Sequence, residues 1–211
     1  MSSKNSVTEY LEQLLTRGGV RDAAVNAHRL AADGQGLLNL MQKDAYNLEN
    51  TCQCSGSAAE LLRLTAALTS RRITDRYKAG KRYTDEQIRE YAVGLLFGEA
   101  NETVVAILFD KSGRLISTEY VSDGIVSSAG FLPRKLLDIM TRYSACSTVL
   151  AHNHPCGTVK PSKSDIAATS NAISVLGNAE KKLIAHYVVS GFDVCDCMKY
   201  TAEIDTRLGS E

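Results

Sequence analysis

The chain lacks three features that would narrow its function class at once: a long apolar run, a signal-peptide core and an excess of one charge. No apolar stretch approaches the roughly 20 residues that cross a bilayer, and the start MSSKNSVTEYLEQLL has no leader-like apolar core. The 24 Lys and Arg balance the 24 Asp and Glu, whereas proteins that depend on phosphate contacts are usually basic. We therefore expect a cytoplasmic protein with no membrane partner, and the charge balance argues against a dedicated nucleic-acid binder.

The cysteines also lack the pattern of a disulfide framework or a zinc knuckle. In a cytosolic chain of this size they are expected to be reduced thiols. Two pairs have C-x-C spacing, whereas zinc knuckles typically have C-x-x-C. We therefore expect ordinary thiols at all six positions: Cys52, Cys54, Cys146, Cys156, Cys195 and Cys197.

The first half of the chain has no proline, and its pattern is helical. From Val7 to about Leu96 the apolar residues recur at steps of three and four, as in AAELLRLTAALTSRR. At 211 residues the chain suits one medium domain or two small ones. We predict a small helical domain over residues 1–92.

After Asn101 the pattern becomes β-like and alternates with helices. TVVAILFD, RLISTEYV, CSTVLA and KKLIAHYVVSG read as strands, whereas LPRKLLDIMTRY and SDIAATSNAISVLG read as helices. Such alternation predicts an α/β (α+β) fold, a mixed sheet flanked by helices. The boundary is expected between Arg82 and Asn101, with the second domain spanning residues 98–211.

Two of the four histidines stand two residues apart, directly after the predicted strand CSTVLA. In extended backbone, residues i and i+2 point to the same side, so His152 and His154 can converge on one point. Asp165 follows after a turn that contains proline and glycine. Two imidazole nitrogens and one carboxylate oxygen form a suitable ligand set for catalytic Zn²⁺, which leaves a fourth position for water.

A plainer reading explains part of this segment. Ser162 and Asp165 have the S-x-x-D spacing of a helix N-terminus, with Ser162 as the cap and Asp165 facing the helix dipole. The cap does not explain the two histidines, and one loop can provide both a cap and a ligand. We therefore predict a metal site at His152, His154 and Asp165.

The segment resembles a known signature. His152, His154, Ser162 and Asp165 match H-x-H-x(7)-S-x(2)-D, the signature of the JAMM (JAB/MPN) metalloprotease fold. AHNHPCGTVKPSKSD is more narrowly similar to the RadC-like branch, HNHPSGDPTPSxxD. The flanking segments resemble successive elements of that family in order, over about Glu102 to Gly191.

The resemblance implies a role for two further residues. A glutamate on an earlier strand of the fold acts as general base, and Glu102 fits because it precedes Asp110 by eight positions, as in the family. Glu99 is the alternative. By the same resemblance, Ser162 stabilises the oxyanion of the tetrahedral intermediate.

The sequence departs from the family around the ligands. Cys156 replaces the usual Ser, Thr158-Val159-Lys160 replaces Asp-Pro-Thr, and Ala185-His186 replaces Asp-His. These changes leave the ligands intact and bear on the substrate groove. We interpret His186 as a core histidine that can also support the site.

Two other zinc or nucleophile chemistries do not fit. Cytidine-deaminase chemistry needs H-x-E and P-C-x-x-C, and both are missing. Cys156 and His154 are too near in sequence for the usual geometry of a nucleophile and its base.

The helical half resembles the N-terminal part of RadC-like proteins, which contains a DNA-binding helix-hairpin-helix. Gly56 is retained, but Cys54 stands where the first glycine is expected, so the hairpin is degenerate. The basic run from Arg71 to Arg82 can contact phosphate or simply face solvent.

We therefore predict a zinc-dependent metallopeptidase or isopeptidase that acts on a peptide or protein substrate. Glu102 and Ser162 are its catalytic residues, and one Zn²⁺ is its cofactor. The alternative is a DNA-repair-associated DNA-binding or scaffolding protein with a vestigial metal site.

Overall fold

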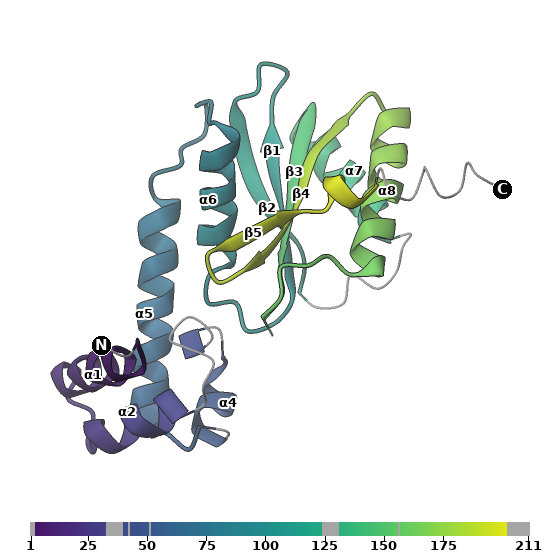
Figure 1. The fold of residues 1–211 in the computed structure, drawn as a ribbon. Helices are drawn as coiled ribbons and strands as arrows, with labels where there is room; N and C mark the ends of the chain where they lie inside the picture. Colours follow the sequence, from purple (N-terminus) through teal and green to yellow (C-terminus); the bar gives the residue numbers. More distant parts are fainter. Residues whose placement is uncertain are drawn as a thin grey trace. The chain divides into compact units, whose positions relative to one another are not determined.

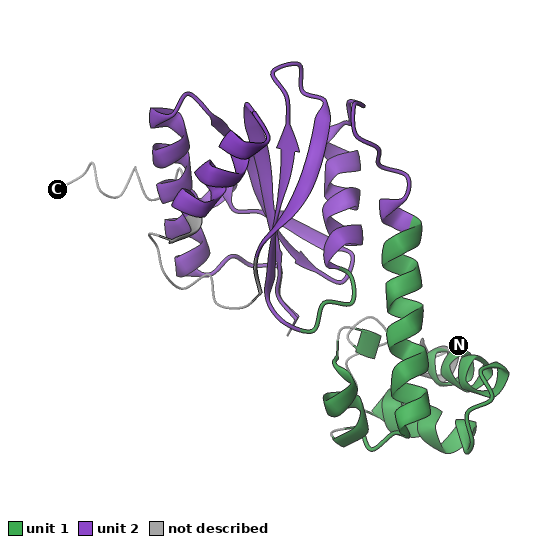
Figure 2. Ribbon diagram, turned by 180° about the vertical axis from the view of Figure 1, so that it is seen from behind, with its two compact units in different colours: residues 1–72, 97–100 green, residues 73–96, 101–211 purple. Residues whose placement is uncertain are grey.

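A computed structural model describes residues 3–32, 40–41, 43–50, 52–123, 131–155 and 157–201. The chain forms two compact units, which Figure 2 distinguishes by colour. Unit 1 comprises Met1–Arg72 and Phe97–Ala100, and unit 2 comprises Ile73–Leu96 and Asn101–Glu211. Each unit has its own hydrophobic core. Among the described helices, none combines the length and apolar character needed to cross a membrane.

Unit 1 is helical, as the three- and four-residue apolar periodicity predicted. Its helices are α1 (Ser3–Arg17), α2 (Ala23–Ala32), α4 (Ala45–Asn50) and α5 (Gly56–Thr74), of which α5 ends in unit 2. The buried residues of α5 in unit 1 lie at helical spacing: Ala58, Ala59, Leu62 and Ala66. A Cβ at Gly18 would lie 2.3 Å from Leu61 Cδ2, so the glycine after α1 permits close packing against α5.

The turn before α5 is held by the chain's own polar groups. The Ser55 hydroxyl accepts the Ala58 N–H at 3.3 Å and caps the helix, while the Ser55 N–H donates to Asn26 Oδ1 at 2.9 Å. The Cys54 thiol donates to the Leu48 carbonyl at 3.2 Å, and burial raises its pKa to about 11. Cys54 is therefore an inert core thiol at the position where the resembled hairpin has glycine.

Unit 2 contains a five-stranded mixed sheet in the order β2-β1-β3-β4-β5 (Figure 1). The strands are β1 (Thr103–Phe109), β2 (Leu115–Asp123), β3 (Ser147–Asn153), β4 (Lys182–Ser190) and β5 (Asp193–Asp196). β1 is antiparallel to β2 and β3, β3 is parallel to β4, and β5 is antiparallel to β4. The predicted α/β fold with a mixed sheet is confirmed.

Helices cover both faces of this sheet (Figure 1), and its interior strand β1 is buried along its whole length. Helix α6 (Asp85–Leu96) packs on the face that carries Val105 and Ile107. Helices α7 (Phe131–Arg142) and α8 (Lys163–Asn178) pack on the face that carries Val104 and Ala106. Alternate residues of β1 therefore belong to two separate cores.

The two units divide the chain differently from the predicted domains, 1–92 and 98–211. Helix α6 belongs to unit 2 because Ile88, Tyr91 and Leu96 pack in the same core as Val105 of β1. Residues 97–100 belong to unit 1, where Phe97 packs with Met41. The helical period of this segment indicates a buried face but does not identify the core that covers it.

Local predictions in unit 2 agree closely with the observed elements. Pro133 occupies the first turn of α7, and the β1–β2 hairpin turns at Gly113, whose φ of 72° suits glycine. The short strand β5 was not predicted. The described cysteines are free thiols, and Cys156 lies outside the described residues.

Candidate metal centre

Strand β3 places the two histidines. His152 is the penultimate residue of β3, and its partner on β1 is Val104. His154 lies just beyond the strand, but its N–H donates to the Val189 carbonyl at 2.9 Å, which continues the pairing with β4. The backbone therefore stays extended through His154, and both imidazoles lie on the α8 side of the sheet, as their spacing predicted.

Helix α8 supplies the carboxylate. Ser162 is the N-cap, and its side chain and that of Asp165 form a reciprocal capping box. Asp165 Oδ2 accepts the Ser162 N–H at 2.7 Å and the Ser162 hydroxyl at 2.6 Å. The predicted cap is confirmed, and it fixes the rotamer of the candidate ligand.

The three candidate ligand side chains meet at one place. His152 Nε2 and His154 Nε2 are 3.1 Å apart. His152 Nε2 lies 3.5 Å from Asp165 Oδ1, and His154 Nε2 lies 3.5 Å from Asp165 Oδ2. The side chains of His152 and Asp165 are 1% and 4% exposed, while that of His154 is 20% exposed, so the cluster has one partly open side. A group with these three donors can hold a metal ion.

The spacing of the donors can be compared with a tetrahedral site. Zn–N and Zn–O bonds of about 2.0–2.2 Å place neighbouring ligand atoms of a tetrahedron about 3.3–3.6 Å apart. The separations of 3.1 Å between the two Nε2 atoms and 3.5 Å between His152 Nε2 and Asp165 Oδ1 are close to these values. The residues present therefore fit a small tetrahedral cation with two nitrogen ligands and one oxygen ligand.

Each histidine is held through its other ring nitrogen. His154 Nδ1 lies 2.8 Å from the Thr158 carbonyl, which can only accept, so this nitrogen donates. His152 Nδ1 lies 2.9 Å from His186 Nε2. On the far side of His186, Nδ1 lies 2.6 Å from the Thr169 hydroxyl.

The electrostatics of the cluster favour an ionised Asp165. Burial opposes its charge, but the neighbouring His152 and His154 imidazoles and the hydrogen bond from Ser162 outweigh burial and hold the pKa of Asp165 far below its ordinary value. The hydrogen bond to Asp165 raises the pKa of His154 against the effect of burial, and the charge of Glu102 adds to the rise. A carboxylate beside two imidazoles is an environment that attracts a cation.

His186 is as deeply buried as His152, whereas His154 is partly exposed. Burial, together with the neighbouring charge of His152, lowers the pKa of His186 to about 3. His186 is therefore neutral at physiological pH.

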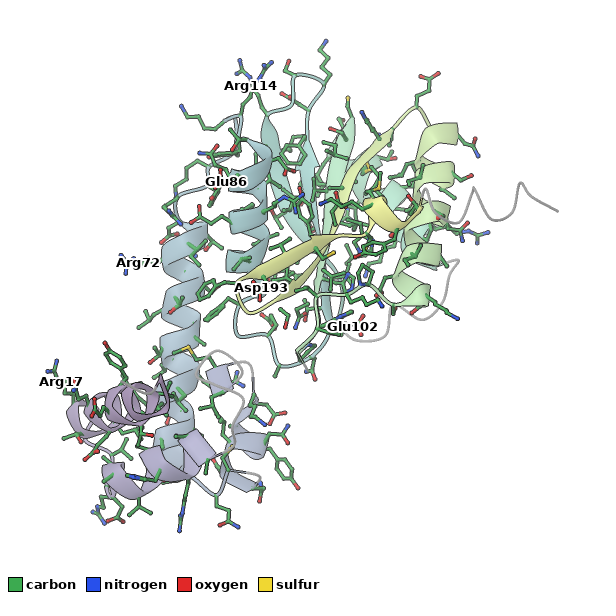
Figure 3. All side chains as sticks on the ribbon, viewed as in Figure 1. Arg17, Arg72, Glu86, Glu102, Arg114 and Asp193 are labelled. Atoms are coloured by element: carbon green, nitrogen blue, oxygen red, sulfur yellow. The ribbon has the colours of Figure 1, made fainter. Side chains whose placement is uncertain are left out.

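Glu102 directly precedes β1, which begins at Thr103. Figure 3 labels it at the end of the sheet where β1 begins. The β1–β3 register pairs Val104 with His152, and its continuation by two residues sets Glu102 opposite His154. Period-two alternation then gives Glu102 the same face as Val104 and His152.

Glu99, the alternative base, belongs by its contacts to unit 1, whereas Glu102 and the three ligands belong to unit 2.

The sequence interpretation missed a residue that secures the Glu102 segment. Asn153, between the two histidines, accepts the Thr103 N–H at 2.8 Å and donates to the Asn101 carbonyl at 3.0 Å. An asparagine at a strand end gives no sequence signal for such long-range contacts.

A comparison with known families decides the classification. The model of the RadC-like JAB domain matches residues 83–198. The chain belongs to this family. The match begins at the residues before α6 and includes the whole sheet and the three candidate ligands.

Relatives of the RadC-like JAB chain are similar over almost its full length. A UPF0758 protein of Vibrio cholerae serotype O1 (strain ATCC 39315 / El Tor Inaba N16961) is 29% identical over 92% of this chain and 96% of its own. A UPF0758 protein of Idiomarina loihiensis is 28% identical, with 89% and 85% covered. One from Vibrio campbellii is also 28% identical, with 84% and 88% covered. These family names specify no activity.

Proposed function

We propose that the chain is a zinc-dependent hydrolase of the metallopeptidase or isopeptidase type. The observation that carries the proposal is the cluster of His152, His154 and Asp165, whose candidate ligand atoms all lie within 4.8 Å of one another. Its nitrogen and oxygen donors suit Zn²⁺, and three protein ligands leave a coordination position for water.

The cation contributes Lewis acidity: when bound, it lowers the pKa of a coordinated water to about 7 and polarises a substrate carbonyl. The chain supplies the remaining functions. His154 presents Nε2 to the site because its Nδ1–H is held by the Thr158 carbonyl. Asp165 presents Oδ1 because Oδ2 is occupied by the two hydrogen bonds from Ser162.

Glu102 is the proposed general base. The continued β1–β3 register opposite His154 and the effect of the Glu102 charge on His154 support this role, and Asn153 restrains the backbone on both sides of Glu102. In that position it can take a proton from the attacking water and pass it to the leaving amine.

Ser162 is the proposed oxyanion donor, a role that competes with its present hydrogen bond. Its hydroxyl donates to Asp165 Oδ2 and lies 2.7 Å from Ser164 Oγ. A short rotation about its side-chain torsion would redirect the hydroxyl proton to a substrate oxygen.

The hydrolase proposal is tested with quenched-fluorescence peptide mixtures and a lysine isopeptide-linked peptide pair as probes. Zinc-loaded protein is expected to cleave at least one probe class, and chelation is expected to abolish cleavage. Absence of cleavage across both classes by fully zinc-loaded protein would contradict a peptidase.

A basic surface supports a second candidate function, DNA association. Two backbone hydrogen bonds join the segment before α6 to the start of β2: the Lys81 carbonyl accepts the Leu115 N–H at 2.8 Å, and the Gly80 N–H donates to the Leu115 carbonyl at 2.7 Å. This pairing brings together three exposed basic residues, Lys81, Arg82 and Arg114. Duplex binding that weakens steeply with salt would support this candidate, and absence of binding at low salt would contradict it.

A further inference from the structure

A chain of hydrogen bonds leaves one candidate ligand and returns to another. His152 Nδ1 contacts His186 Nε2 at 2.9 Å, and His186 Nδ1 contacts Thr169 Oγ1 at 2.6 Å. Thr169 Oγ1 then lies 2.6 Å from the backbone carbonyl of Asp165, one helical turn earlier. All four residues are buried, with at most 3% of their surface exposed. We call this path the Thr169–His186 relay.

Only one arrangement of protons satisfies every contact of the relay. The Asp165 carbonyl has no proton, so the Thr169 hydroxyl must donate to it. Because the only hydroxyl proton of Thr169 is used in that bond, the Thr169 oxygen must accept a hydrogen bond from His186 Nδ1–H. A neutral His186 then has a lone pair at Nε2.

The same logic fixes His152. Because His186 Nε2 can only accept, His152 Nδ1 must carry the proton of their 2.9 Å contact. A neutral His152 therefore has its lone pair at Nε2, the atom that faces His154 Nε2 and Asp165. Without an anchored relay, either ring nitrogen of His152 could hold the proton, and the tautomer protonated at Nε2 cannot bind a metal through that atom.

A further buried group adjoins the relay without changing this order. The Cys197 thiol is fully buried and hydrogen-bonded with Thr169. Since the Thr169 proton is spent on the Asp165 carbonyl, the S–H can donate to the second lone pair of the Thr169 oxygen.

We propose that Thr169 and His186 are positioning residues that hold His152 in the tautomer with a free Nε2. The proposal rests on the metal site of the proposed function and deepens it: metal binding then requires no change of tautomer at His152. The relay also links two ligands, since Asp165 provides its carboxylate to the site and its carbonyl to the relay.

The matched pair Thr169→Val and Thr169→Ser tests the relay. Valine keeps the shape and removes the hydroxyl, so His186 loses its acceptor and its proton is free to move to Nε2. His186 then donates to His152 Nδ1, and the His152 proton moves to Nε2. Serine keeps the hydroxyl and should keep the wild-type order.

The first readout is the tautomer itself. Two-bond ¹H–¹⁵N correlation spectra of metal-free protein at about pH 8.5, where ordinary histidines are neutral, report the protonated nitrogen of each ring. We expect Nδ1 protonation of His152 and His186 in the wild type and Thr169→Ser, and Nε2 protonation of His152 in Thr169→Val. Nε2 protonation of His152 in the wild type would overturn the proposal.

The second readout is zinc affinity by competition with a chromophoric chelator. Loss of an outer partner of a metal-bound histidine typically costs about 10–100-fold in affinity, and we expect a loss in this range for Thr169→Val but not for Thr169→Ser. Equal affinity of the wild type and Thr169→Val would overturn the relay and leave the hydrolase proposal intact. If the wild type shows the expected tautomers but takes up no zinc, the proton order is supported and the proposed function is overturned.

A second pair covers the case in which Thr169→Val fails to fold. His186→Gln keeps one acceptor and one donor, whereas His186→Leu keeps neither. Retained zinc affinity in His186→Gln with a loss in His186→Leu supports the relay. Retained affinity in both variants contradicts it.

Discussion

The side-chain oxygen of Asn153 accepts the backbone N–H of Thr103 at 2.8 Å, across fifty residues of sequence. The amide group of the same side chain donates to the Asn101 carbonyl at 3.0 Å. One fully buried residue between the two histidines thus holds both sides of Glu102. The position of the candidate base is tied to the strand that carries the candidate ligands.

Asn153→Ala should destabilise the protein. The substitution leaves the Thr103 N–H and the Asn101 carbonyl without their partner in a buried setting, which costs about 1–3 kcal/mol per unsatisfied group. Urea unfolding measures the change, and Asn178→Ala, at an exposed position of α8, serves as the control. If Asn153→Ala lowers the free energy of unfolding by no more than Asn178→Ala does, the restraint of the Glu102 segment by Asn153 is contradicted.

Glu102→Gln should keep zinc and lose turnover. The amide preserves the size of the side chain but cannot accept the proton, and general-base catalysis contributes about 10²–10⁴-fold to kcat. Zinc content and probe hydrolysis are measured together. Glu99→Gln is the matched control and should retain activity; the reverse pattern would assign the role to Glu99.

Ser162→Ala should affect both stability and turnover. Removing an N-cap serine costs about 0.5–2 kcal/mol, and removing an oxyanion donor costs about 10²–10³-fold in kcat. Ser170→Ala, an exposed serine within the same helix, controls for the loss of a hydroxyl on α8. Unchanged kcat in Ser162→Ala, with reduced stability, would restrict Ser162 to its capping role.

Tyr187→Phe should make the stability of unit 2 less sensitive to acid. The Tyr187 hydroxyl donates to Asp85 Oδ1 at 2.5 Å, and Arg89 donates to Oδ2 at 2.7 Å. Burial opposes the charge of Asp85, but these hydrogen bonds outweigh it and lower its pKa. A carboxylate with a lowered pKa stabilises the fold above its unfolded-state pKa of about 3.9 and loses that contribution as the pH falls through the folded value.

The Tyr187→Phe comparison is made by urea unfolding at about pH 7 and about pH 3. At the higher pH the variant should be less stable by about 0.5–1 kcal/mol, at the low end for a hydrogen bond because the carboxylate of Asp85 is largely exposed. The difference in unfolding free energy between the wild type and Tyr187→Phe should be smaller at the lower pH. A difference that stays constant or grows on acidification would contradict the assignment to ionised Asp85.

The sequence was sufficient for the features that depend on local geometry. The convergence of His152 and His154 follows from two-residue spacing in extended backbone, and the Ser162 cap follows from S-x-x-D. Both lie within one strand–turn–helix segment. The fold class followed from the alternation of strands and helices.

The features that sequence did not reveal depend on contacts between distant residues. Helix α6 shows a clear apolar face, but only the packed core assigns that face to Val105 and Ile107. The local sequence does not distinguish Thr169 from other helix residues, but in the folded chain its hydroxyl contacts His186 of β4. Side-chain roles of this kind arise from pairing across the chain, which local spacing does not encode.

The zinc content of the purified full-length chain tests the central claim most directly. After loading and removal of weakly bound metal, elemental analysis should find about one zinc ion per chain, as expected for a site with three protein ligands. Asp165→Asn, which keeps the shape of the side chain and removes its charge, should lose most of this zinc while remaining folded. Wild-type protein without stoichiometric zinc, or Asp165→Asn with a full complement, would contradict the account.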